Sequence, residues 1–553
     1  MSRVALLAAV AAAALAGAGD AAAARWAVGL EPDARPEAVA FRITAATGRA
    51  VERELKPLGA LVVEAPSAAR LRTIPGVAWV ERVDTQRRLA FVPADPLHTR
   101  QWYLAQVRAF DAWEEPPPFT GPLVAIVDSG IDVDHPEFAR AVRAHRSFVP
   151  GRATVDAQGH GTFVAGIVGA RHNGAGIAGI AFASELLVAK VVDADGSISV
   201  EAEAAAIRWA VDAGARVINL SLGGLRDPRD PRRDTFSQLE AAAVDYAVSR
   251  GVVVVAAVGN ADSAPAQPWP YANYPAALPH VIGVSALGRD GSVPVFSHRD
   301  RIYNDLSAPG QEIYSTFPRA LTAVRASCVN QGFSDCAGDD YRRAEGTSFS
   351  APQVAAAAAL LLAARPDLRA DQVSHLLTRT AVDANASTGC RACALQRDAL
   401  SGWGRLDVAA AVAQATQGSL PPADALEPND DAGARAATLW GAAARTVRAT
   451  IDFWDDQNDV YRVMLRPGQR LEARLTGAPG GTRVFLWSPG TRTVEGLSVA
   501  VQQRRVAQSA HRGGAEVLVY RAPRARVGDG WYYLHVKSTA PGFGRYALRY
   551  AKR

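Results

Sequence analysis

The sequence predicts an α/β protein whose main domain is a doubly wound, mostly parallel sheet, preceded by a small α+β segment and followed by an antiparallel β-sandwich. Three observations lead to this prediction. Short runs rich in Val and Ile alternate with helix-length segments in the centre of the chain, smaller strand-like and helix-like pieces precede them, and alternating strand patterns separated by Gly and Pro follow. The length of 553 residues, with 49% apolar and 21% charged residues, suits several globular folding units.

Residues 1–24 have the pattern of a secretory signal peptide. Arg3 gives the positive start, Val4 to Leu15 form the apolar stretch, and Ala21 to Ala24 supply a small-residue cleavage site. An uncleaved membrane anchor is the alternative, but an anchor needs about 18 or more apolar residues, and glycine and aspartate interrupt this run. We therefore expect a secreted protein, extracellular or periplasmic, with no membrane association after signal removal.

Residues 25–89 alternate between strand-like and helix-like pieces and predict a small α+β unit. A proline-containing stretch, Pro93 to Pro96, separates this unit from the rest of the chain. The expected strands and then the expected helices are Trp26–Leu30, Ala60–Glu64, Val77–Val83, Pro36–Ala46 and Ala68–Arg72.

The main domain, residues 95–417, contains the short apolar runs that predict strands buried on both faces, as in a parallel sheet. Helical patterns lie between these runs, and Val354–Ala364 is too short to span a bilayer and suits a buried helix. In such sheets functional residues gather at the carboxyl ends of the strands. The expected strands and helices are Leu123–Val127, Leu186–Val192, Val217–Leu220, Val252–Ala257, Val281–Val284, Ala204–Ala213 and Phe236–Ser249.

Residues 424–553 change to alternating strand patterns parted by Gly and Pro, which predict a separate β-sandwich. The expected strands include Val460–Leu465, Arg483–Trp487, Glu516–Tyr520 and Trp531–Val536.

Charge and cysteine content exclude two classes of protein. The net charge of +5 comes from 60 basic and 55 acidic residues mixed along the chain, so we expect no nucleic-acid partner. Four cysteines are too few for a disulfide scaffold, although export favours local disulfides, first Cys328 with Cys336 and Cys390 with Cys393 among three connectivities. Cys390-Arg-Ala-Cys393 as a redox or metal motif is the alternative, and no second pair at metal-site spacing supports zinc.

Three motifs each place a reactive side chain beside glycine at the end of a predicted strand or the start of a predicted helix. Asp128 ends the strand of Val-Ala-Ile-Val-Asp-Ser-Gly, His160 lies between glycines in Gly-His-Gly-Thr-Phe-Val-Ala-Gly, and Ser348 lies in Gly-Thr-Ser-Phe-Ser-Ala-Pro before an apolar helix. A serine nucleophile needs a base to remove its proton, and an imidazole base needs a carboxylate to fix its tautomer. Singly, these residues could be a turn former, a helix start and a helix cap.

Together the three motifs, in this chain order, resemble those of the subtilisin-like serine proteases, the subtilases. The resemblance implies the doubly wound fold and a serine endopeptidase that hydrolyses peptide bonds through an acyl-enzyme on Ser348. His160 would be the general base and then acid, and Asp128 the orienting carboxylate. Phe163, Ser350 and Gln353 depart from residues frequent in the family, but none of these departures removes a reacting group.

The same resemblance implies an oxyanion donor and a substrate groove. Val-Val-Val-Ala-Ala-Val-Gly-Asn nominates Asn260 as the amide donor, with an ordinary loop asparagine as the alternative. Asn219-Leu-Ser-Leu-Gly-Gly224 resembles the extended segment with which substrates pair, and the primary pocket would lie between Ala257–Gly259 and Asn273-Tyr-Pro. The expected substrate-binding residues are Ser221, Leu222, Gly223, Ala257, Gly259 and Asn273.

Segments that resemble the calcium loops of the thermitase-like branch nominate Asp95, Glu137 and Asn173 as metal ligands. They lie in Ala-Asp-Pro, His-Pro-Glu and Asn-Gly-Ala-Gly-Ile, and their oxygens suit calcium. Calcium would be structural and is not needed for the chemistry. Plain turn residues are the alternative, because glutamate replaces the aspartate of the family pattern.

The two flanking regions also carry resemblances. Residues 25–89 resemble the subtilase inhibitor propeptide, which implies a zymogen and an intramolecular inhibitor, with the junction between Asp84 and Pro93 left open. Leu426-Glu-Pro-Asn-Asp-Asp431 and Gly544-Arg-Tyr-Ala-Leu resemble the bacterial pre-peptidase C-terminal domain. We expect a monomer that acts on protein or peptide substrates.

Three other functions remain open at the level of the sequence. A degenerate protease would bind peptides without cleaving them, but all four chemical groups are present. An esterase of another hydrolase fold would present serine as Gly-x-Ser-x-Gly, and Ser350 occupies the place of the second glycine. An adhesion protein would depend on the region from Asp424 onward rather than on proteolysis.

Overall fold

The computed structural model describes residues 24–83, 91–113, 120–261, 264–322, 340–417, 425–427, 429–433, 435–453, 456–494, 499–540 and 542–553. They divide into two units, up to Leu89 and from Ala90 onward, and each is described by itself. Residues 1–23 of the expected signal peptide, residues 84–90 of the expected junction, and Cys328 with Cys336 lie outside the described residues.

The first unit is a four-stranded antiparallel sheet in the order β2-β3-β1-β4, with two helices. Proline at the start of α2 and Gly48, with φ 71°, at its end delimit that helix. Val28, Val39 and Ile43 form the centre of its core. The elements are β1 (Ala24–Leu30), α2 (Pro36–Thr47), β2 (Val51–Leu55), β3 (Ala60–Ala65), α3 (Ala68–Arg72) and β4 (Val77–Arg82). The predicted elements are therefore confirmed here, and β2 is the strand that the sequence analysis missed.

The second unit contains a seven-stranded sheet in the order β11-β10-β9-β8-β5-β7-β6, with every neighbouring pair parallel. The two faces of the central strands alternate strictly, because Ala125 and Val127 belong to one core and Val124 and Ile126 to the other. The strands are β5 (Leu123–Asp128), β6 (Val142–Ser147), β7 (Glu185–Lys190), β8 (Val217–Leu220), β9 (Val253–Ala257), β10 (Val281–Leu287) and β11 (Leu306–Pro309). The doubly wound parallel sheet is confirmed.

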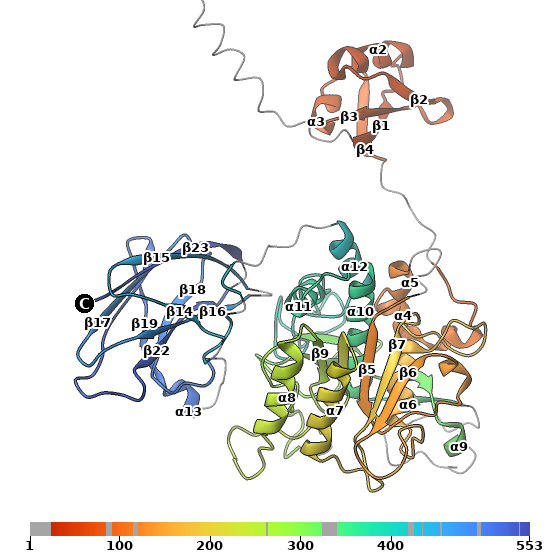
Figure 1. The fold of residues 1–553 in the computed structure, drawn as a ribbon. Coiled ribbons are helices and arrows are strands. Elements are labelled where there is room, and N and C mark those ends of the chain that lie inside the picture. The colour runs from red at the N-terminus through yellow and green to blue at the C-terminus, as the bar shows by residue number, and fades with distance from the viewer. Residues whose placement is uncertain are drawn as a thin grey trace, which may run out of the picture. The chain divides into compact units, whose positions relative to one another are not determined.

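Helices cover both faces of this sheet (Figure 1). Helices α7 and α8 share one core with the strands, and α6 and α10 share the other. The helices of this region are α4 (Trp102–Gln106), α5 (Ala109–Ala112), α6 (His160–Gly169), α7 (Val200–Asp212), α8 (Gln238–Val248), α9 (Arg319–Thr322), α10 (Ala351–Ala364), α11 (Ala370–Arg379) and α12 (Val408–Gln417). A hairpin of β12 (Ile313–Thr316) and β13 (Tyr341–Ala344) accompanies them.

Helix α10 runs through the core of the second unit, as its apolar sequence predicts. All of its residues except the last two are buried. Among the described helices, the stretch Thr347–Ala364 is long and apolar enough to cross a membrane, but 83% of it is buried inside the protein. It is therefore packed as the core helix of a globular domain.

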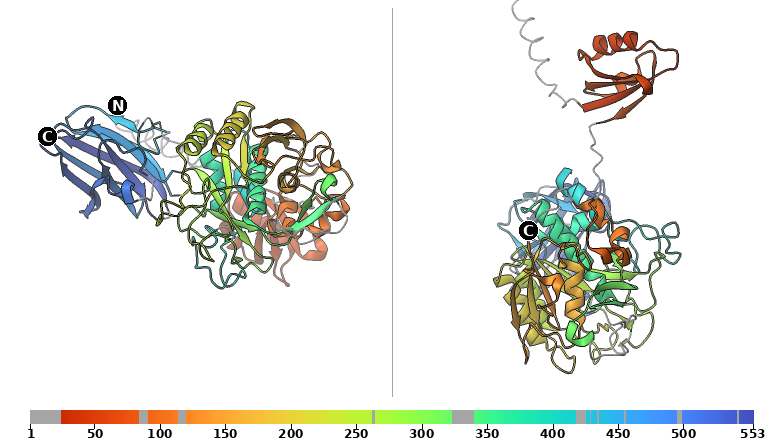
Figure 2. Two further views of the ribbon diagram at one scale, coloured as in Figure 1. Left: turned by 90° about the horizontal axis from the view of Figure 1, so that it is seen from below. Right: turned by 90° about the vertical axis from the view of Figure 1, so that its right-hand side faces the viewer.

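The C-terminal region forms two five-stranded sheets that face each other across an apolar core (Figure 2). All pairings are antiparallel except that of β14 with β16. The elements are β14 (Ala437–Leu439), β15 (Arg445–Asp452), β16 (Asn458–Met464), β17 (Arg470–Thr476), β18 (Thr482–Trp487), α13 (Val499–Gln502), β19 (Arg505–Gln508), β20 (Ala510–Arg512), β21 (Ala515–Arg521), β22 (Trp531–Ser538) and β23 (Phe543–Lys552). The β-sandwich prediction is confirmed.

Cys390 and Cys393 form a disulfide, with a distance of 5.3 Å between their Cα atoms. This pairing agrees with the local disulfide that the sequence analysis expected first for these two cysteines.

Candidate active site

Asp128 lies at the carboxyl end of β5, in the centre of the parallel sheet. Its side chain is 2% exposed, and one carboxylate oxygen accepts a hydrogen bond from the backbone N–H of Ser129 at 2.7 Å. The chain turns away at Gly130, whose φ is 113° and where a Cβ atom would lie 2.9 Å from the carbonyl oxygen of Ala153. Glycine is required at this turn because both the backbone conformation and the space exclude a side chain.

His160 is the first residue of α6 and faces Asp128. Its Nδ1 lies 2.8 Å from Oδ1 and 3.0 Å from Oδ2 of Asp128. Burial lowers the pKa of His160, but the charge of Asp128, the hydrogen bond to it and the charge of Asp156 outweigh burial, so the pKa is raised above its usual value. Nδ1 therefore carries the proton that Asp128 accepts, and the other ring nitrogen, Nε2, is the basic atom of the neutral ring.

Asp156, which the sequence analysis did not identify, links the turn after β5 to the start of α6. One carboxylate oxygen accepts from Ser129 Oγ at 2.7 Å and from the backbone N–H of Gly159 at 2.8 Å. The other accepts from the backbone N–H and the hydroxyl of Thr162, at 2.8 and 2.7 Å. This buried carboxylate thus connects the turn after β5 to the first turn of α6. In the sequence, the one signal for Asp156 was its position just before the start of a helix.

Ser348 lies in a short 3-10 turn, Thr347–Phe349, and α10 begins only at Ala351. This turn leads directly into α10 through Ser350, so the serine lies at the mouth of the long helix, as the sequence predicts. Its hydroxyl donates to the carbonyl oxygen of Ser221 at 3.2 Å, and Ser221 Oγ donates back to the carbonyl oxygen of Ser348 at 2.7 Å. The ring of His160 lies 5.4 Å from that of Phe349, which places the turn next to the imidazole.

Asn260 follows β9 and meets the same turn. Its Oδ1 accepts from both the backbone N–H and the hydroxyl of Thr347, each at 3.0 Å. The amide nitrogen lies 3.2 Å from the point where a Cβ atom of Gly346 would stand. Because the oxygen is engaged twice, the N–H₂ group is the part of Asn260 available to an acceptor bound beside Ser348.

The predicted substrate-binding residues lie on two segments, 221–223 and 257–259, and at Asn273, which contacts both. Ser221, Leu222 and Gly223 follow β8, and the next residue, Gly224, pairs with Tyr274 through two backbone hydrogen bonds of 2.9 Å. Ala257 ends β9, and a Cβ atom on Gly259 would lie 2.6 Å from the side-chain amide of Asn273. The structure therefore brings the two segments together through Tyr274 and Asn273.

His298 is a neighbour of this pocket that no sequence pattern indicated. It is fully buried, and its Nδ1 would lie 2.6 Å from a Cβ atom on Gly259. Burial lowers the pKa of His298 to about 4, so the ring is neutral near neutral pH. Asn273 and His298 thus give the region beneath Gly259 two buried polar side chains.

The three predicted metal ligands also meet. Asp95 and Glu137 are fully buried, and Asp95 Oδ1 accepts from the backbone N–H groups of Asn173 and Gly174 at 2.9 and 3.1 Å. Among the described residues, Asp95 Oδ2 and Glu137 Oε2 are buried without a hydrogen-bond partner. The pKa of Glu137 is raised to about 7, mainly by burial and to a smaller extent by the charge of Asp95, against the lowering effect of hydrogen bonds from Ile177 and Tyr341. Two buried carboxyl oxygens that lack donors fit a hard cation at this place.

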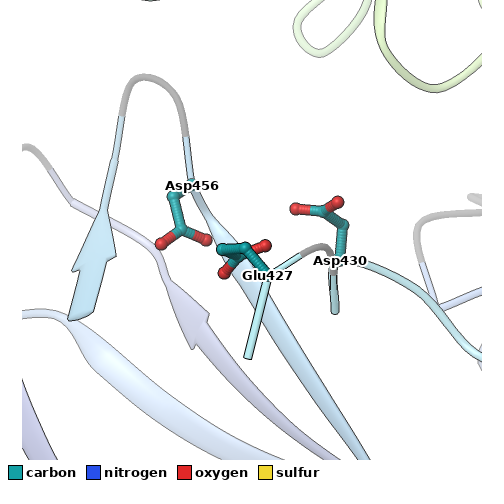
Figure 3. A group of neighbouring side chains, drawn as sticks. All are labelled: Glu427, Asp430 and Asp456. Atoms are coloured by element: carbon teal, nitrogen blue, oxygen red, sulfur yellow. The ribbon is translucent and has the colours of Figure 1, made fainter. Parts of the chain in front are cut away.

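A second acidic group lies in the C-terminal region (Figure 3). Carboxylate oxygens of Glu427, Asp430 and Asp456 lie within 4.8 Å of one another, and all three side chains are partly exposed. Three carboxylates at this spacing are a candidate cation site, although partly exposed acidic groups of this kind also occur without a metal.

Comparisons with known proteins show what this chain is similar to. The sequence profile of the "Subtilase family" matches residues 120–404. Subtilisin E of Bacillus subtilis is 32% identical over 338 residues, which cover 60% of this chain and 78% of that protein. Thermitase of Thermoactinomyces vulgaris is 35% identical over 275 residues, covering 49% and 85% of the two chains. A solved structure of a protease from Pseudoalteromonas arctica aligns over 59% of this chain and all of that chain, with 26% identity and a TM-score of 0.48.

Proposed function

Because this chain belongs to the subtilase family of serine endopeptidases, we propose that Ser348, His160 and Asp128 are its catalytic triad and Asn260 its oxyanion donor. The observation that carries this proposal is the contact between His160 Nδ1 and Asp128 at 2.8 Å, next to the turn that bears Ser348. A buried carboxylate that fixes the imidazole tautomer is what a serine nucleophile needs from its surroundings.

Acylation begins when the hydroxyl of Ser348 turns from the carbonyl of Ser221 toward the imidazole. Oγ attacks the carbonyl carbon of the scissile peptide, and its proton passes to Nε2 of His160. The positive imidazolium is stabilised by Asp128, which stays ionised. His160 then donates the proton to the leaving amine as the C–N bond breaks, which leaves the acyl group on Ser348.

Deacylation repeats the same steps with water. His160 takes a proton from the water molecule that attacks the ester carbonyl, and it returns that proton to Ser348 Oγ as the C–O bond breaks. In both halves the negative oxygen of the tetrahedral intermediate accepts a hydrogen bond from the amide N–H₂ of Asn260. Thr347 holds this amide in place because it donates twice to the Asn260 oxygen.

The remaining proposals concern the form in which the enzyme is made. The apolar start of the chain supports export to the periplasm or the medium. The first unit has its own core and supports a role as an inhibitor propeptide, residues 25–89, that is cut from a zymogen. We expect the mature domains to be residues 95–417 and 424–553, the second of them a pre-peptidase C-terminal-like domain, and the enzyme to be a monomer.

Structural calcium is the last part of the proposal. Asp95 and Glu137 supply the two buried carboxyl oxygens that lack donors, and Asn173 lies beside Asp95 on an adjacent loop. A bound calcium ion would neutralise charge at this place and would take no part in peptide hydrolysis.

The experiment that tests the catalytic proposal compares Ser348→Ala with Ser350→Ala, each secreted and prepared in the same way. Ser350 is the matched control, because its buried hydroxyl donates only to the carbonyl groups of Ala308 and Pro309. Hydrolysis of casein should fall by about a millionfold in Ser348→Ala and persist in Ser350→Ala. Full casein hydrolysis by Ser348→Ala would refute the assignment.

A further inference from the structure

Two buried glutamates lie beside residues 221–224, here called the substrate segment. They have no role in the reaction described above. Glu203, on the first turn of α7, and Glu240, on the first turn of α8, are each 4% exposed. A hydrogen bond joins the two side chains directly. Burial raises the pKa of both, that of Glu240 to about 7, so the pair holds a proton near neutral pH.

No cation accompanies this pair of carboxyl groups within the described part of the chain. Glu203 Oε1 is buried there without a hydrogen-bond partner, and no ion pair joins either glutamate to a basic side chain. The arginines of the neighbouring segment 225–235 pair instead with Asp227, Asp230 and Asp300. An exposed acidic residue in the first turn of a helix is ordinary, as Glu201 shows, but two that are buried against each other need a different explanation.

The two glutamates lie close to the segment on which we expect the substrate to bind. Helices α7 and α8 lie side by side and follow β7 and β8, so both begin at the carboxyl edge of the parallel sheet, where the substrate segment also lies (Figure 1). Leu222 of that segment packs on the core that contains Ala202 and Ala204, the two neighbours of Glu203. The charge of Glu240 acts on Tyr274, which is paired with Gly224 at the end of the substrate segment.

Exposed apolar side chains surround the same place. Val200 is 38% exposed, Phe236 45% and Leu239 52%, and all three lie at the start of α7 or α8. The ring of Phe236 meets that of Tyr274 edge-on at 5.5 Å. An aliphatic stem could lie against these side chains while its charged end reaches the carboxyl groups, which is how arginine and lysine are usually accommodated.

The distance from Ser221 to Gly224 along the substrate segment identifies which residue of the substrate reaches the two glutamates. Tyr274 pairs with Gly224, three residues beyond Ser221, whose carbonyl group accepts from Ser348. An extended chain rises about 3.3 Å per residue, so this place lies about 10 Å from the reacting carbonyl. A peptide paired with Ser221–Gly223 reaches it with its fourth residue before the scissile bond.

We propose that Glu203 and Glu240 are the specificity determinant of a subsite for a basic side chain, with arginine preferred, at the fourth substrate residue before the scissile bond. This inference rests on the proposed endopeptidase function. A guanidinium group offers several N–H donors in one plane, so it can satisfy both carboxylates and the unpartnered oxygen of Glu203 together. On binding, the proton held by the pair passes to the solvent, and both glutamates face the cation as carboxylates.

The test uses four-residue peptide anilides that differ only in the first residue, which is arginine, its uncharged isostere citrulline, or norleucine. The wild-type enzyme should show a kcat/KM about ten- to a hundredfold higher for arginine than for citrulline, the range typical of hydrogen bonds to charged groups. In Glu203→Gln and in Glu240→Gln this ratio should fall toward one. Glu201→Gln, on the exposed side of α7, should keep the preference.

Equal rates for arginine and citrulline in the wild type would overturn the proposal, as would a preference that survives in both glutamine variants. The comparison of the two peptides needs only the wild-type enzyme, so it decides the question even where one variant fails to fold. If the wild type cleaves none of the three peptides and no casein, the endopeptidase function fails instead, and the two failures are therefore distinguishable.

Discussion

Two pairs of buried groups at the same edge of the parallel sheet handle charge in opposite ways. Asp128 is buried against the imidazole of His160, and it raises the pKa of that ring, so acid and base stabilise each other. Glu203 is buried against another acid, Glu240, and burial raises the pKa of each. A buried carboxyl group with an internal partner suits catalysis, whereas one without such a partner suits the binding of a cation from outside.

The largest expected effect comes from replacing Asp128, the partner of His160. Asp128→Asn should lower kcat by about ten-thousandfold, because the amide favours the wrong imidazole tautomer. In the wild type, kcat/KM should rise with pH through a midpoint above about 6.5, the usual histidine value, since the raised pKa keeps His160 protonated to higher pH.

The pH profile of residual activity in Asp128→Asn checks the cause of that effect. The main influence that raises the pKa of His160 is lost with the carboxylate, so the midpoint should move to lower pH. An unchanged midpoint would mean that Asp128 does not set the pKa of His160, and the contrast between the two pairs would then fail.

Asn260→Ala should have the next largest effect, a fall in kcat of about a hundred- to a thousandfold with little change in KM. The amide binds charge that develops only in the transition state, so the loss should not weaken binding of the peptide. Steady-state kinetics on the norleucine peptide measure both constants. A rise in KM with unchanged kcat would assign Asn260 to substrate binding instead.

The smallest expected effect concerns a third buried pair, Asp95 and Glu137, whose free oxygens suit an internal cation. Calcium at a hundred times its Kd would stabilise the folded enzyme by about 2.7 kcal/mol. The melting temperature, measured in calcium and in a chelator, should therefore differ in the wild type and much less in Asp95→Asn.

Glu427→Gln, in the C-terminal acidic group, is the matched control and should keep most of the calcium dependence. If Glu427→Gln loses the calcium dependence and Asp95→Asn keeps it, calcium acts at the C-terminal group and not beside Asp95.

The sequence predicted most of the main sheet because its strands are continuous Val-rich runs. It nominated Asp128, His160 and Ser348 because each of their motifs couples a reactive residue to glycines. The strands missed in the first unit and in the sandwich, such as β2 and β15, carry alternating charged residues that lack an apolar run. Edge strands of this kind take their structure from their neighbours rather than from their own composition.

The missed site residues have a different reason. Glu203 and His298 are placed by contacts between segments that are distant in sequence, and no local motif surrounds them. Asp156 takes its role from the contact with Ser129, which only the fold shows. The sequence carried one usable signal for Glu203. The apolar residues at helical spacing from it, Ala206, Ile207 and Ala210, mark its side of α7 as the face that the structure buries. A charged residue on a buried helical face indicates either a partner or a binding role, and only the fold shows that its neighbour is Glu240.

The most direct test of the catalytic assignment is covalent labelling with a peptidyl phosphonate, followed by mass mapping of the modified residue. We predict a single label on Ser348 in the wild type, labelling that rises with pH as His160 loses its proton, and far slower labelling in Asp128→Asn. A label on another serine, or equal labelling of the wild type and Asp128→Asn, would contradict the assignment of Asp128, His160 and Ser348 as one catalytic unit.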